Sequence, residues 1–131
     1  MLKISPVVIL LGMLGVLLSS CRSVASSTAP AGTVEAYIQA LVGMDKNHLS
    51  ALSCSTWEPT ALQEMDSFQA VKTRLEGLAC QVSGTDGATT LVKCQGKIIA
   101  TYNGEDQALD LSVRTYQVVQ QGGEYVVCGF R

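Results

Sequence analysis

Cysteine and histidine are the residue types in this chain that could form a zinc site, and the cysteines could instead form disulfides. Four cysteines lie between residues 54 and 128, and the one histidine is His48. The cysteines lack Cys-x-x-Cys spacing and a single imidazole adds little, so we expect no metal site and no cofactor. An even number of cysteines forms disulfides where the compartment is oxidising. The four are Cys54, Cys80, Cys94 and Cys128.

The N-terminus has the features of an export signal that ends at a fifth cysteine, Cys21. Lys3 is its one charged residue, and residues 7–18 are an unbroken run of apolar residues and glycine. A membrane-spanning helix needs roughly 20 apolar residues, whereas a short positive start, an apolar centre and small residues are typical of a cleaved signal peptide. Leu18-Ser19-Ser20-Cys21 resembles the lipobox of bacterial lipoproteins. The resemblance implies cleavage after residue 20 and a lipid on Cys21; the alternative is an ordinary signal peptide beside an unrelated cysteine.

A lipid on Cys21 would attach the chain to a membrane without a spanning helix. Each buried acyl CH2 contributes about 0.8 kcal/mol, so one acyl chain holds only marginally and the several that a lipobox implies would hold firmly. Arg22 stands where an Asp would favour retention at the inner membrane of a two-membrane bacterium, by the same resemblance. We therefore expect an exported protein, anchored by palmitate-like lipid to the cell membrane or outer membrane, with its domain outside the cytoplasm.

The composition predicts one small domain behind this signal. Removing residues 1–20 leaves 111 residues, in which 8 basic and 11 acidic residues give a formal charge of −3. This length is sufficient for a core, and the acidic balance offers no basic surface for nucleic acid. Residues 21–32 are rich in Ser, Ala, Thr and Pro and predict a flexible tether, which leaves residues 33–131 for the domain.

The first half of the domain has helical periodicity. Thr33 is placed to cap a helix that ends near Gly43, and Asp45 is placed to cap a short second helix. A third helical stripe runs from Ala61 to Leu78, and Asp66 could divide it into two helices. The apolar stripe of the first helix is Val34, Tyr37, Ile38, Leu41 and Val42.

After Gly77 the periodicity becomes that of strands. Turn signals at residues 85–87, 103–104 and 122–123 separate β-rich segments and predict four antiparallel strands. The expected fold is therefore α+β, with the N-terminal helices packed on one face of a curved four-stranded antiparallel sheet.

The turns also predict which residues oppose each other, and opposed residues share a face. They set Cys80 opposite Cys94, Ile98 opposite Leu109, and Cys94 opposite Val113. The face toward the helices is then Val82, Val92, Ile98, Leu109, Leu111, Val113, Val119, Val126, Phe130 and three cysteines. The face toward water is Gln81, Lys93, Gln95, Lys97, Asp110, Ser112 and Arg114.

This register predicts the disulfides. Cys80 and Cys94 are opposed neighbours, close enough to bridge. That leaves Cys54 to pair with Cys128, tying the helical half to the last strand. A Cys94–Cys128 bridge is disfavoured because the third strand lies between the two.

Several apolar side chains fall on the otherwise polar face. Exposed apolar groups of this kind mark an interface, here for a homodimer; the alternative is a bulge that turns some of them inward. The group is Leu91, Tyr116, Val118, Tyr125 and Val127.

Helices followed by a long, curved antiparallel sheet resemble the nuclear transport factor 2-like, cystatin-like α+β roll. The resemblance covers residues 33–131: residues 33–45 are similar to the opening helix of that superfamily, and residues 104–127 to its final hairpin. It implies a roll that often encloses a pocket between helices and sheet. Some members are isomerases, dehydratases or cyclases and others only bind ligands or dimerise, so the fold alone does not choose among them.

Three residues are candidates for lining such a pocket. Tyr37 lies on the core stripe, His48 is the one candidate base, and Trp57 follows Cys54. The alternatives are a core tyrosine, an exposed helix residue and a tryptophan packed over the nearby bridge. No acid–base group faces inward in this register, so no residue is assigned a catalytic role.

The sequence thus favours a membrane-tethered, non-enzymatic binding or interaction module for a protein or small-molecule partner that it does not identify. The alternative is a small-molecule-binding or enzymatic pocket, of isomerase or dehydratase type, in the same fold.

A purely structural envelope lipoprotein is a third hypothesis, and no repeat or wall-binding signature favours it.

Overall fold

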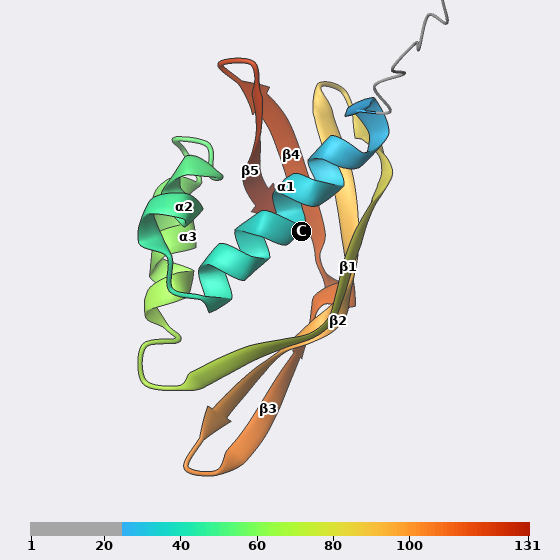
Figure 1. The fold of residues 1–131 in the computed structure, drawn as a ribbon. Coiled ribbons are helices and arrows are strands. Elements are labelled where there is room, and N and C mark those ends of the chain that lie inside the picture. Colours follow the sequence, from blue (N-terminus) through green and yellow to red (C-terminus); the bar gives the residue numbers. More distant parts are fainter. Residues whose placement is uncertain (1–24) are drawn as a thin grey trace, which may run out of the picture.

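The computed structural model describes residues 25–131 (Figure 1), with side chains from residue 29 onward. The predicted signal peptide and Cys21 lie outside these residues. The described chain has an α+β fold of three helices and a five-stranded antiparallel sheet. Its elements are α1 (Ala25–Val42), α2 (Lys46–Ala51), α3 (Glu58–Asp66), β1 (Lys72–Asp86), β2 (Thr89–Tyr102), β3 (Glu105–Asp110), the 3-10 turn η1 (Leu111–Val113), β4 (Thr115–Gln121) and β5 (Glu124–Phe130).

The sheet is built around β2, in the order β1–β2–β4–β5. One edge of β2 pairs with β1, and the other edge pairs with β4 through residues 90–93 and with β3 through residues 97–102. The β2–β3 hairpin therefore extends away from the helices and from β4–β5, as Figure 1 shows.

Helix α1 starts eight residues before the predicted cap at Thr33. The Thr33 hydroxyl donates to the Ala29 carbonyl at 3.0 Å inside the helix, and Pro30 is fully buried. The prediction of a flexible tether is therefore wrong for residues 25–32, because composition alone does not reveal that Pro30 packs into the core. The predicted stripe is confirmed, since Val34, Tyr37, Ile38 and Leu41 are fully buried.

The third helical stripe was predicted too long. Helix α3 ends at Asp66, and β1 begins at Lys72, so Leu75 and Leu78 lie in a strand. Both side chains pack against the core from the strand. Their spacing of three residues fits a helix, and in the strand the register shift between Glu76 and Ala79 lets both side chains reach the core.

The sheet bends where β1 and β2 cross at two glycines. Gly96 has φ +101°, and a Cβ there would lie 2.5 Å from the Glu76 carbonyl oxygen and 2.6 Å from that of Gly77. Gly77 has φ +64° and lies in a register shift of β1 between Glu76 and Ala79. The close approach requires glycine, and a bulge at this point bends the strands.

Most of the predicted register is confirmed. Cys80 opposes Cys94, Val82 opposes Val92, Ile98 opposes Leu109, and Val119 opposes Val126. The predicted opposition of Cys94 and Val113 is wrong, because η1 interrupts what was predicted as one third strand. The sheet consequently has five strands and not four.

Turn η1 is formed by a local side-chain cap. Asp110 accepts hydrogen bonds from the backbone N–H of Ser112 at 2.9 Å and from its hydroxyl at 2.7 Å. After the turn, β4 sets Tyr116 opposite Val92, one residue out of phase with β3. A slip of one residue turns every following side chain to the other face. Val113 accordingly becomes 71% exposed.

The slip overturns the predicted interface. Tyr116, Val118 and Val127 are fully buried, while Leu91 and Tyr125 are half-buried. The structure agrees with the alternative interpretation, in which an irregularity of the strand turns some of these residues inward. In the described part of the chain, no helix is long and apolar enough to cross a membrane.

Candidate functional site

The predicted pocket residues Tyr37 and Trp57 meet in the core. Tyr37 comes from α1, and Trp57, directly before α3, donates its indole N–H to the Tyr37 hydroxyl at 3.0 Å. The Tyr37 ring packs edge-on against Tyr116 of β4, and Trp57 packs edge-on against Phe130 of β5. These side chains fill the space between helices and sheet, where the roll resemblance implies a pocket.

Burial also determines the protonation of the Tyr37 hydroxyl. Removal from water raises the pKa of Tyr37 well above its usual range, against the opposing effect of the Trp57 hydrogen bond, and the Glu64 carboxylate adds to the rise. The hydroxyl therefore stays protonated near neutral pH and is unsuited to act as a general base.

His48 is not brought to this cluster. Its side chain is exposed on α2, and its backbone N–H donates to Asp45 Oδ1 at 3.1 Å, which caps the helix. The exposed-helix interpretation of His48 therefore describes its position, and the predicted pocket set is not assembled.

An ion pair that the sequence did not indicate lies beside the aromatic cluster. Arg114 donates to Glu64 of α3 at 2.7 Å, and the two side chains are 14% and 16% exposed. The Arg114 guanidinium also lies 4.0 Å from the centre of the Phe130 ring, in range of a cation–π contact. Burial lowers the pKa of Arg114, but neighbouring Tyr116 and Glu64 outweigh it and the pKa is raised.

Arg114 was expected on the water-facing side and lies inward because of the slip at η1. The signal that could have located it is the Asp110-x-Ser112 spacing, since Asp readily caps a turn two residues on. The groove beside the pair, lined by Thr60, Gln63 and Phe130, has a volume of about 330 Å³ and is open to solvent.

The Tyr116 hydroxyl, behind Arg114, is buried, and within the described residues it has no partner of hydrogen-bonding geometry. Burial raises its pKa, and the adjacent Arg114 guanidinium, a potential donor to this oxygen as well as a positive charge, opposes the rise. An unpartnered buried hydroxyl costs stability. The Tyr116 hydroxyl therefore lowers the stability of the aromatic cluster relative to an apolar side chain of the same shape.

Both predicted disulfides are formed. Cys80 bridges Cys94 across β1 and β2 with Cα atoms 4.0 Å apart, and Cys54 bridges Cys128 of β5 with Cα atoms 5.2 Å apart. Disulfides of this kind persist in an oxidising, extracytoplasmic environment. Cys21 lies outside the described residues.

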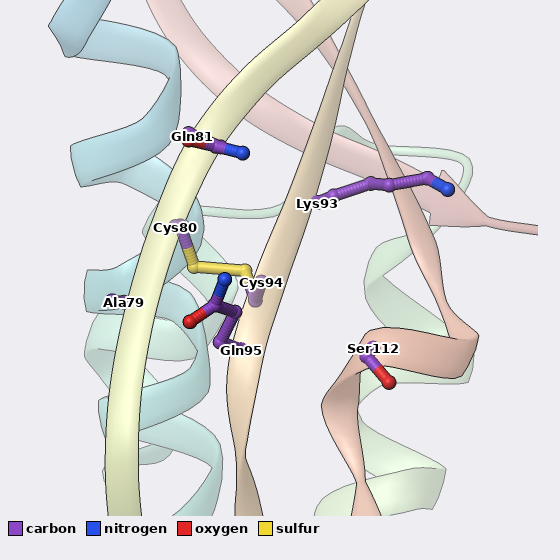
Figure 2. A pocket seen from close by; sticks show the side chains of 7 residues that line it. All are labelled: Ala79, Cys80, Gln81, Lys93, Cys94, Gln95 and Ser112. Carbon is purple, nitrogen blue, oxygen red and sulfur yellow. A yellow bond between two sulfur atoms is a disulfide. The ribbon is translucent and has the colours of Figure 1, made fainter.

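A shallow pocket lies on the outer sheet face, over the Cys80–Cys94 bridge (Figure 2). Its volume is about 380 Å³, and its walls come from β1, β2 and η1. The disulfide forms its floor, and Lys93 carries its only charge. The other lining residues are Ala79, Gln81, Gln95 and Ser112. These groups could hydrogen-bond a polar ligand, but they include no acid–base pair.

No protein-family model matches the chain, and no curated protein matches it significantly. Among solved structures, it is similar to Aln2 from a Streptomyces species, with a TM-score of 0.51 and 13% identity. The match covers 76% of this chain and 82% of that one. A likeness at this identity shows a related fold and no more.

Proposed function

We propose that this chain is an exported lipoprotein whose domain is a non-enzymatic interaction module, held at a membrane by lipid on Cys21. The observation that carries the proposal is the pair of disulfides, which indicates an oxidising compartment. The lipobox-like residues 18–21 supply the anchor in this proposal.

The start of α1 supports a close attachment. Ala25, where α1 begins, is four positions after Cys21, and the chain between them spans at most about 14 Å. The core begins at Pro30, which is fully buried. An anchor on Cys21 would thus hold the N-terminal end of α1 next to the bilayer.

The filled interior supports interaction over catalysis. Tyr37 and Trp57 bond to each other, His48 is exposed, and Glu64 is neutralised by Arg114. We also propose that the domain is a roll of the nuclear transport factor 2-like type, which the order of helices and curved sheet supports.

Mass spectrometry of the chain purified from membranes tests the anchor. We expect a chain that begins at Cys21 and carries a diacylglyceryl mass, and Cys21→Ala should release the protein from the membrane fraction. An unmodified Cys21 in the exported protein would reject the anchor.

The outer pocket favours a second candidate, binding of a small polar molecule. Lys93 and the Gln81 and Gln95 amides suit a ligand that bears a carboxylate and several hydroxyls. Native mass spectrometry of the wild-type chain should then show an adduct that Lys93→Gln removes, with Lys46→Gln on exposed α2 as the control. A wild-type spectrum without adduct would favour the interaction module.

A further inference from the structure

Two other edges of the sheet are each bonded to another part of the chain at one point. On β1, the Cys80 N–H donates to Glu35 Oε1 of α1 at 2.8 Å. On β5, Val127 exchanges backbone hydrogen bonds with the segment after α2: its N–H donates to the Leu52 carbonyl at 2.7 Å, and its carbonyl accepts from Cys54 N–H at 2.9 Å. At these points a further strand could not add without displacing the bonded segment.

The outer edge of β3 is uncovered. In the described chain β3 pairs with β2 alone, and five of its six residues are exposed. A two-residue turn makes Tyr102 and Glu105 the first hydrogen-bonded pair, so alternate residues after Glu105 point their backbone groups outward. Asp106 and Ala108 therefore present free N–H and C=O groups along this edge.

The hairpin that carries this edge is held in shape by its outer face. Arg74 of β1 donates to Asp106 Oδ2 at 2.9 Å, and it also pairs with Glu76 at 3.3 Å. The Thr101 hydroxyl donates to the other Asp106 oxygen. These contacts restrain the hairpin, and restraint of this kind lowers the entropic cost of adding a strand.

The charges of β3 indicate the partner. Its sequence, Glu-Asp-Gln-Ala-Leu-Asp, has three carboxylates and no cation; Asp106 is bonded to Arg74 and Asp110 to Ser112. Glu105 has no ion pair among the described residues. Antiparallel pairing of Ala108 with Ala108 of a second copy would set Asp106 opposite Asp110 twice, and opposed like charges are destabilising. The edge therefore disfavours self-association and favours a basic segment.

We infer that the outer edge of β3 is a docking site at which an extended, basic segment of a partner protein adds as a further strand. This inference rests on the proposed function as an interaction module and names its surface and partner class. Main-chain hydrogen bonds provide the affinity in such β-augmentation, and side-chain charge selects the partner.

The position of β3 suits a tethered module. Helix α1 contacts the sheet with Glu35 at Cys80 and ends near the β2–β3 hairpin, where Thr73 donates to the Val42 carbonyl at 2.9 Å. Figure 1 shows the hairpin at the opposite end of the molecule from the start of α1. A domain anchored before α1 would present β3 away from the bilayer.

The test uses the full exported chain, isotope-labelled and purified in detergent with its disulfides intact. The probe is a capped peptide of alternating lysine and valine, and the matched control peptide alternates glutamate and valine. We expect the lysine peptide, at up to millimolar concentration, to shift the amide resonances of Asp106 and Ala108 and to slow their hydrogen exchange.

Two variants locate the site. Ala108→Pro removes an outward donor at an edge position that tolerates proline, and we expect about a tenfold loss of affinity, the equivalent of one hydrogen bond. Glu105→Lys should weaken binding about threefold. Glu124→Lys is its control, because Glu124 has the same place after the turn of the β4–β5 hairpin, and it should change nothing.

Absence of shifts in β3, equal binding of the glutamate peptide, or equal effects of the Glu105 and Glu124 variants would overturn the docking site. Shifts of β3 that depend on protein concentration without peptide would make a second copy the occupant, which also overturns it. An acylated chain that fails to bind the peptide rejects the docking site alone, whereas a binding chain without lipid rejects the tether alone.

Discussion

The β4–β5 and β2–β3 hairpins begin alike, each with a two-residue turn followed by a glutamate, Glu124 or Glu105. Their surroundings differ. Strand β5 contributes the buried Val126 and Val127, and its edge is bonded to the segment after α2. Strand β3 has no buried residue and is held by ion pairs on the surface.

The difference separates a part of the sheet that maintains the fold from a part that is presented to solvent. Buried apolar area contributes most of the free energy of folding, and exposed ion pairs contribute under about 1 kcal/mol each. Changes near β5 should therefore unfold the domain, and changes at the five exposed residues of β3 should alter its surface only.

Loss of the Cys54–Cys128 bridge, which joins β5 to the helical half, should have the largest effect on stability. The double change Cys54→Ser and Cys128→Ser opens a loop with a sequence separation of 74 residues, and chain entropy predicts a cost of about 4.4 kcal/mol. The pair Cys80→Ser and Cys94→Ser opens a separation of 14 residues and should cost about 3 kcal/mol. Urea unfolding without reductant measures both, and a larger loss for the shorter loop would contradict this account.

Substitution of Gly96, at the bend where β1 and β2 approach each other closely, should have the next largest effect. Gly96→Ala places a methyl group against two carbonyl oxygens and strains a positive φ, at a cost of about 3 kcal/mol. Gly87→Ala is the matched control, because Gly87 also has a positive φ but has open space around it, and it should cost about 1 kcal/mol. Equal losses in thermal unfolding would show that crowding at the bend is unimportant.

Substitutions of two tyrosines test whether the core between the helices and β4–β5 is optimally packed. Tyr37→Phe leaves the half-buried Trp57 N–H without its acceptor and should cost about 1 kcal/mol. Tyr116→Phe removes a buried hydroxyl that has no partner in the described chain, so stability should stay level or rise. Urea unfolding compares the two, and a clear loss in Tyr116→Phe would mean that Arg114 bonds this hydroxyl in solution.

The same contrast explains which features the sequence could predict. The Cys80–Cys94 bridge and the Ile98–Leu109 pair follow from turns with strong local signals, because register is counted outward from the turn. Tyr116 and Val118 were placed on the wrong face because Leu111 to Val119 shows no glycine or proline that would mark an interruption. The one local signal was Asp110, two residues before Ser112.

The candidate site was harder to predict than the fold. The Arg114–Glu64 pair joins residues 50 positions apart, and its burial depends on the slip at η1. The burial of Pro30 likewise depends on the sheet beneath α1, and a composition rich in Ser, Ala and Pro carries no trace of it. Long-range packing of this kind is absent from local patterns.

The smallest expected effect is a pH dependence of amide exchange in the exposed β2–β3 hairpin. The hydrogen bond from Arg74 lowers the pKa of Asp106, and Thr101 adds to the effect. A lowered folded-state pKa stabilises the hairpin above the ordinary carboxylate pKa of about 3.9, and the stabilisation is lost as pH falls through the lower value. Amide exchange of β3 should therefore become faster, relative to the intrinsic rate, as the solution is acidified, while Val127 exchange is unchanged. Asp106→Asn should speed β3 exchange at neutral pH and abolish this acid response, whereas an unaltered response in that variant would assign it to Asp110, whose pKa is lowered by its hydrogen bonds with Ser112.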